Sequence, residues 1–215
     1  MNIALNTNKE FKSLIPPLTA EEYSQLQENL INDGIREPIS VWNNTIIDGH
    51  NRYEIAKSYG LGYETKTHHF DNESDAMLWI IKNQFGRRNL KAYDRSKLAL
   101  KMKPLIAEKA KGKQILGGED KVCQKSDKPI DTKKEIAKIA GVSHDTITKV
   151  EKIESAAVAE IIKLVKNDEI SINQAEKAAR LNSECQKEIA PFLEAGETVE
   201  KITSKLRISH NTGNN

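Results

Sequence analysis

Residues 132–153 read TKKEIAKIAGVSHDTITKVEKI, a pattern typical of two short helices joined by a tight turn. Helices that cross steeply need a small residue where they touch and a turn residue that accepts positive φ, which Ala137 and Gly141 supply. Apolar positions 136, 140, 142, 147 and 150 would form the shared core, with Thr132 and Ser143 as helix caps. The segment therefore predicts a helix-turn-helix, and the alternative is a plain helical hairpin.

The second helix of such a motif carries the predicted DNA-reading face. Polar residues early in a recognition helix reach base edges in the major groove of double-stranded DNA. A threonine can hydrogen-bond a base, and a lysine can bind guanine or phosphate. An aspartate would repel phosphates, so it is expected to face a base donor or to cap the helix. The candidate residues are Ser143, His144, Asp145, Thr146, Thr148 and Lys149.

Positive charge is concentrated before this motif. Eleven Lys or Arg and only two acidic residues lie between Lys82 and Lys113, giving +9 in a chain of net charge +2. The asymmetry predicts a basic surface that faces a polyanion, and the alternative is an ordinary solvated helix face. The candidate phosphate contacts are Arg87, Arg88, Lys91, Arg95, Lys97 and Lys101.

Composition indicates a helix-rich chain, with 30% charged and 5% aromatic residues among 215. No run of 18 apolar residues and no apolar leader are present, so a cytoplasmic, nucleoid-associated protein without membrane contact is expected. Cys123 and Cys185 are far apart and match no metal-ligand spacing, so no metal site is assigned.

The organisation predicted is a small mixed sheet with helices, an α+β domain over residues 1–90, followed by an all-helical region. Thr19–Glu22 has the form of a capping box, and Asn43-Asn44 joins two short strands as a hairpin. The helix-turn-helix domain spans 91–160, with a long helix that Pro104 should kink or split and a flexible loop at 112–131. C-terminal helices occupy 161–209, and 210–215 is a disordered tail.

A second candidate site lies at Asp48-Gly-His-Asn-Arg52, where a strand meets a helix. Backbone N–H groups at a helix N-terminus favour an anion, which would explain an arginine in the first turn. The alternative is a tight turn in which Arg52 pairs with Glu22 or Glu54. Arginines and amides after the helix over 72–84 also suit phosphate, unless they are only a linker. The candidate phosphate-binding residues are Gly49, His50, Asn51, Arg52, Asn83, Arg87 and Arg88.

Four segments in order resemble the ParB-like family: GIREP at 34–38, DGHNRYEIA at 48–56, KNQFGRRNL at 82–90, and the helix-turn-helix. That family includes plasmid and chromosome partition proteins and regulators on mobile elements, and its N-terminal fold is shared with sulfiredoxin and a free-serine kinase. The resemblance implies sequence-specific DNA binding by a homodimer, in partition with a partner ATPase or in transcription regulation.

The resemblance also implies a nucleotide. Partition-type members bind CTP and Mg²⁺, and Gly49, Arg52 and Asn83 match their phosphate- and metal-site positions. His50 and Lys82 stand where the family has acidic residues, which disfavours Mg²⁺. CTP or another nucleotide with Mg²⁺ is the candidate ligand, and no residue is assigned as catalytic. The alternative is a ParB-fold enzyme, a CTPase-like nucleotide hydrolase, a kinase or a nuclease, that uses the Asp48–Arg52 site.

Overall fold

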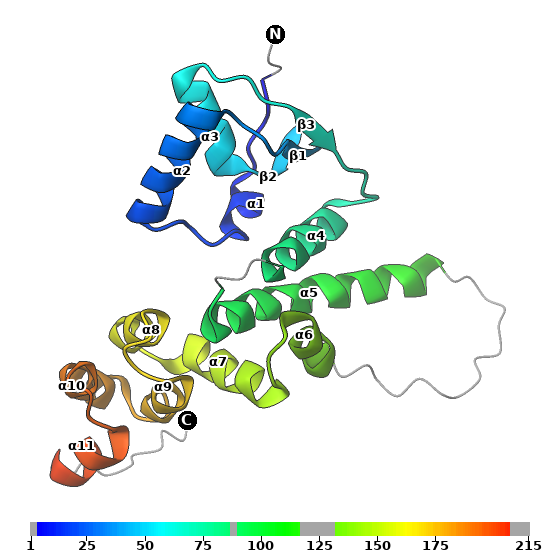
Figure 1. The fold of residues 1–215 in the computed structure, drawn as a ribbon. Coiled ribbons are helices and arrows are strands. Elements are labelled where there is room, and N and C mark those ends of the chain that lie inside the picture. The colour runs from blue at the N-terminus through cyan, green and yellow to red at the C-terminus, as the bar shows by residue number, and fades with distance from the viewer. Residues whose placement is uncertain (1–3, 87–89, 117–131, 207–215) are drawn as a thin grey trace. The chain divides into compact units, whose positions relative to one another are not determined.

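The structure is a computed structural model that describes residues 4–86, 90–116 and 132–206, without the side chains of 109–116 (Figure 1). The chain divides into two compact units, Met1–Arg88 with Pro104–Gly118, and Asn89–Lys103 with Glu119–Asn215. The division falls within α5 (Ala92–Leu116). The first unit is mixed α and β and the rest is helical, which confirms the predicted fold class.

A three-stranded sheet in the order β2-β1-β3 organises the first unit. β1 (Ile39–Trp42) pairs antiparallel with β2 (Thr45–Asp48) and parallel with β3 (Thr65–Thr67). The hairpin turn is Asn43-Asn44, with φ of 47° and 60°. Two residues of positive φ give a turn whose twist matches that of the strands, so the predicted hairpin is confirmed.

In the described part of the first unit, α1 (Lys9–Ser13), α3 (His50–Tyr59) and α4 (Glu73–Phe85) contact the sheet, and α2 (Ala20–Asp33) packs on α3. Thr19 and Glu22 form the predicted capping box of α2. α1 was not predicted from the sequence, because five residues are too few to show a helical period. The core beside the sheet consists of Leu5, Ile39, Val41, Ile46 and Tyr53.

The second unit is built from the start of α5 and six further helices. Its core brings together Tyr93 of α5, Ile153 of α7, Ile161 of α8, Ile189 of α10 and Ile202 of α11. Ser171 caps α9, since its side chain accepts from the Gln174 N–H. The six helices are α6 (Thr132–Ala140), α7 (His144–Ala156), α8 (Ala159–Lys166), α9 (Ile172–Ala178), α10 (Ser183–Glu194) and α11 (Val199–Leu206).

α5 bears on two predictions. It is not split at Pro104, and it continues through Gly112 to Leu116, into the segment expected to be a loop. One glycine costs a helix only about 1 kcal/mol, which good helix formers on both sides can offset. The remainder of the predicted loop, 117–131, and the tail, 210–215, lie outside the described residues. Within the described ranges, no helix has the length and apolar character needed to cross a membrane.

Candidate functional site

The helix-turn-helix pattern folds as two helices with a left-handed glycine between them. Gly141 has φ of 64° and follows the last residue of α6. Ser143 caps α7, since its Oγ accepts a hydrogen bond of 3.0 Å from the Thr146 N–H. α6 begins at Thr132, which was expected to cap it. Of the residues predicted for the shared core, Ile136, Ala140, Ile147 and Val150 are buried, whereas Val142 is only half-buried because it lies in the turn. Ala137, the predicted small contact residue, is also buried.

Arg95 holds the turn from α5. Its Nε donates a hydrogen bond of 2.6 Å to the Ala140 carbonyl, the end of α6. A Cβ atom at position 141 would lie 2.9 Å from Arg95 Nη2, closer than such contacts allow. Glycine at 141 is therefore favoured by the left-handed backbone, and a Cβ there would also require the Arg95 guanidinium to shift. Arg95, a predicted phosphate contact, is engaged inside the second unit.

The candidate reading residues lie on the outer surface of α7. His144, Asp145 and Thr148 are exposed, while Thr146 and Lys149 are half-buried. Lys149 Nζ contacts Asp145 Oδ2 one turn earlier, at 2.6 Å. This pair crosses the face that would meet DNA, so it governs how freely Lys149 can reach a phosphate or a base.

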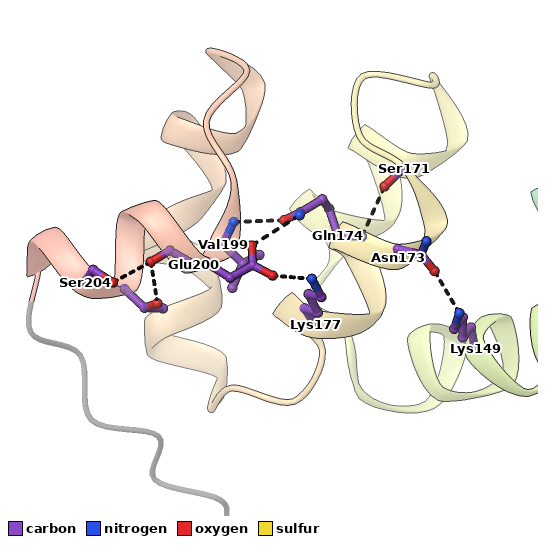
Figure 2. Close-up of polar contacts among 9 residues, drawn as sticks. Lys149, Ser171, Asn173, Gln174, Lys177, Val199, Glu200 and Ser204 are labelled. Carbon is purple, nitrogen blue, oxygen red and sulfur yellow. Dashed lines mark hydrogen bonds and ion pairs between the residues drawn. The ribbon is translucent and has the colours of Figure 1, made fainter.

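A second helix extends this face, and sequence analysis did not anticipate it. Lys149 Nζ also donates to Asn173 Oδ1 on α9, at 2.8 Å (Figure 2). Asn173 is exposed in the first turn of α9. The only signal in the sequence was the cap at Ser171, because the approach of α9 to α7 depends on tertiary packing.

Polar contacts with α11 fix α9 in turn. The Gln174 side chain accepts from the Val199 N–H at 2.8 Å and donates to Glu200 at 3.3 Å (Figure 2). Lys177 donates to the same carboxylate, and this contact is the main reason that the pKa of Glu200 is lowered to about 2. α9, which carries Asn173, is thus held by α11 on one side and by Lys149 of α7 on the other.

Further along α7, two carboxylates bind the basic helix α5. Glu151 contacts Lys103 of α5 at 2.9 Å and Lys133 of α6 at 2.5 Å. Hydrogen bonds from these lysines, Lys133 first, lower the pKa of Glu151. Glu154 contacts Lys97 at 2.8 Å and accepts from the Tyr93 hydroxyl. Part of the basic block therefore builds the second unit itself.

The remaining predicted phosphate contacts differ in how exposed they are. Lys91 pairs with Asp168 at 2.7 Å, yet it stays exposed. Lys101 is half-buried, and burial lowers its pKa. Arg87 and Arg88 lie outside the described residues.

The first unit contains a cavity of about 1260 Å³. The predicted phosphate-binding residues Gly49, His50, Asn51, Arg52 and Asn83 all line it. α1 and α2 complete its wall, with Lys9 and Lys12 among the lining residues. The structure therefore brings the end of α4 together with the start of α3, as the candidate site required.

Gly49 and Arg52 are packed closely at the start of α3. Gly49 has φ of 93°, and a Cβ atom there would lie 3.1 Å from Arg52 Nη2. Arg52 contacts Glu37 at 3.2 Å and Asp48 at 3.6 Å, rather than Glu22 or Glu54. The side chain of Glu37 is 80% exposed, whereas that of Asp48 is 13% exposed. The guanidinium thus has one partner held in the wall and one that can leave into solvent.

Two residues of the cavity wall carry buried nitrogen atoms without a hydrogen-bond partner among the described residues: both ring nitrogens of His50, and Nε of Arg52. Buried polar groups are nearly always satisfied, so such orphans indicate strain or a missing ligand. His50 is 4% exposed. Burial first, and Lys12 second, lower its pKa, so the imidazole is neutral at pH 7.

A divalent metal does not fit the residues that surround this cavity. No group of three His, Cys, Asp or Glu side chains in the described part of the chain is arranged to hold a metal ion. Three carboxylates line the cavity: Asp48 and Glu37 contact Arg52, and Glu22 accepts from the Thr19 N–H in the capping box. Mg²⁺ requires oxygen ligands, and His50 offers a neutral imidazole instead.

Solved structures share the fold of this chain. A pNOB8-like ParB N-domain matches with a TM-score of 0.53 and 20% identity over 81% of this chain and 70% of its own. Its C2221 form matches with a TM-score of 0.52 and 19% identity, covering 81% and 75%. The C-terminally truncated chromosome-partitioning protein ParB from Caulobacter crescentus, complexed to the centromeric parS site, matches with a TM-score of 0.50 and 17% identity, covering 94% and 95%.

At these identities the comparison establishes the fold alone. No protein-family model matches the sequence, and no curated protein does.

Proposed function

We propose that this chain, which has a ParB-like fold, binds specific double-stranded DNA through α7 and holds a phosphorylated ligand in the cavity of its first unit. The observation that carries the DNA proposal is the geometry of α6 and α7. A left-handed Gly141, a buried shared core and a Ser143 cap leave one polar face of α7 exposed. That is the arrangement by which a recognition helix enters the major groove.

Three classes of contact follow from this placement. His144 and Thr148 are exposed on α7 and would touch base edges. Asn173, beside Lys149, would add a base or phosphate contact from α9. Lys91, with the arginines at 87 and 88, would contact the phosphate backbone, which positions a protein without reading sequence.

Selection from random duplexes tests the proposal. The wild-type chain should enrich one sequence, and Thr148→Ala should change which base is preferred. Lys91→Met should weaken binding to every duplex and reduce the slope of log K against log salt by about one, since one phosphate contact is lost. Lys205→Met is the matched control, because Lys205 of α11 is also exposed and ion-paired, with Glu197 as its partner. Enrichment of no sequence would remove the DNA-reading role.

The proposed ligand of the cavity is a nucleotide, with CTP the first to test. Support comes from the helix N-terminus at His50, the close Gly49–Arg52 contact and the unpartnered nitrogens in the wall. Anions are stabilised at such helix termini. Arg52→Ala should abolish calorimetric binding of the nucleotide.

The biological setting proposed is plasmid or chromosome partition, or transcription regulation on a mobile element. The ParB of Caulobacter crescentus was solved complexed to the parS site, which supports a centromere-like target here. A homodimer on a palindromic site, a partner ATPase and a nucleoid location belong to the same proposal. Sedimentation of the chain with its selected duplex tests the dimer, since two chains should bind each duplex.

An enzyme at Asp48 is the second candidate, and the geometry favours binding over catalysis. The Asp48 carboxylate contacts Arg52 and is largely buried, so it is not placed as a free general base. Nucleotide turnover that is lost on Asp48→Asn, with binding retained, would favour the enzyme instead.

A further inference from the structure

Arg52 shows what a ligand entering the cavity must displace. Its guanidinium has two acidic neighbours, Asp48 and Glu37, and also donates to the Pro38 carbonyl at 3.4 Å. Asp48 is held in the wall, whereas the Glu37 side chain is 80% exposed and contacts Arg52 Nη1 from the solvent side. A phosphate oxygen is chemically similar to a carboxylate oxygen and binds the same guanidinium. Glu37 therefore occupies the position that a phosphate would take.

The charges that remain for a ligand come from α1. Lys9 is exposed at the cavity and has no ion-pair partner among the described residues. Lys12 also lines the cavity and contacts Glu54 at 2.5 Å, with half of its side chain exposed. Lysine ammonium groups can neutralise phosphates directly, which is the electrostatic task that a divalent cation performs in other phosphate sites.

We infer that the cavity binds its phosphorylated ligand without a divalent cation, by exchanging the Glu37 carboxylate on Arg52 for a phosphate group while Lys9 and Lys12 supply the remaining positive charge. This inference rests on the proposed ligand site and specifies its chemistry. It follows from the donor set, in which Asp48 and Glu37 contact Arg52, Glu22 is held in the capping box of α2, and a buried His50 stands at the start of α3.

Calorimetry on the full chain tests the cation. CTP, ATP and inorganic pyrophosphate are titrated in EDTA and again in excess Mg²⁺. At least one of them should bind in EDTA with an affinity within about two-fold of that in Mg²⁺. Binding that occurs only with Mg²⁺ would overturn the inference and leave the proposed site intact. No binding of any probe in either buffer would remove the proposed site itself.

The exchange at Arg52 has its own variant. Glu37→Gln should raise affinity by about two- to five-fold, because an exposed ion pair is a weak competitor. Glu64→Gln is the matched control, since Glu64 is exposed in the same unit and does not line the cavity. Unchanged or weaker binding by Glu37→Gln would refute the exchange.

Loss of binding must not be mistaken for loss of folding. Arg52→Lys keeps a cation beside Asp48, and Lys12→Met leaves Arg52 untouched. Both should weaken binding by about ten-fold in EDTA while the tryptophan emission stays that of the wild type. If Lys12→Met binds as tightly as the wild type in EDTA, the assignment of charge to α1 is wrong.

Discussion

Gly141 and Gly60 allow the two costs of replacing a glycine to be separated. Both have φ near 65°, but nothing lies within 4 Å of a Cβ at Gly60, whereas Arg95 Nη2 lies 2.9 Å from one at Gly141. Left-handed backbone costs an alanine about 1–2 kcal/mol. Gly60→Ala should therefore lower the free energy of unfolding by about that amount, and Gly141→Ala by more. Urea denaturation measures both, and equal losses would mean that Arg95 simply moves aside.

His50 should make stability depend on pH. Burial and Lys12 of α1 lower its pKa below the unfolded value of 6.5, while Asp48 and Glu54 act in the opposite direction. Between the two pKa values the unfolded chain binds more protons, so the native state is fully favoured above about 6.5 and loses stability as the pH falls below it. His50→Gln should flatten this part of the profile. His68, whose pKa is also lowered, should keep a smaller slope.

The comparison with His69→Gln supplies the control for that profile, because His69 is exposed on the same unit. An acid slope of the unfolding free energy that is identical in wild type and His50→Gln would mean that His50 is solvated in solution.

At the scale of one helix, the i,i+4 pair of Asp145 and Lys149 sets the charge that α7 presents. Asp145 is 70% exposed and lies 2.6 Å from Lys149. Asp145→Asn removes a charge that repels phosphates and frees the lysine, so affinity for random duplexes should rise by about two- to five-fold. Glu160→Gln on α8 is the control for net charge. Weaker binding to the selected duplex alone would show that Asp145 reads a base.

Elements with a strong local signal were predictable. The capping box of α2, the Asn43-Asn44 turn and the Gly141 turn all arise from residues close in sequence, and the structure confirms each. α1 was missed because its formation depends on the Asn8 cap and on burial of Phe11.

In the candidate sites, too, residues within a local motif were predictable, whereas contacts between distant positions were not. The residues of 49–52 were found from their own motif, whereas the contacts of Arg52 with Glu37 and of Lys149 with Asn173 link positions 15 and 24 residues apart. The role of Arg95 could not be predicted either. It is one of many basic residues in its segment, and nothing in the local sequence indicates that it donates to the Ala140 carbonyl, 45 residues away.

At the scale of the whole molecule, two units with separate cores should unfold at different denaturant concentrations. Both tryptophans, Trp42 and Trp79, belong to the first unit, so their emission reports on that unit alone. Helical circular dichroism comes from both units, since the first unit contains α1 to α4 and part of α5 and the second contains the rest of the helices. The urea transitions measured by the two probes should therefore not coincide, which is the sign of departure from two-state unfolding.

Core substitutions assign each transition. Ile46→Val should shift the fluorescence midpoint, and Ile161→Val the main dichroism midpoint, each by the equivalent of about 1 kcal/mol. If either substitution moves both midpoints equally, the two units unfold as one.

The contact between Arg95 and the backbone at Gly141 also has a consequence for sequence divergence. Since a Cβ at position 141 would lie against the guanidinium, a related protein with asparagine there is expected to have a shorter residue, or a displaced arginine, at position 95. Residues in contact tend to vary together. Positions 95 and 141 should therefore covary among relatives. Residues other than glycine at position 141 should occur mainly in relatives that lack arginine at position 95.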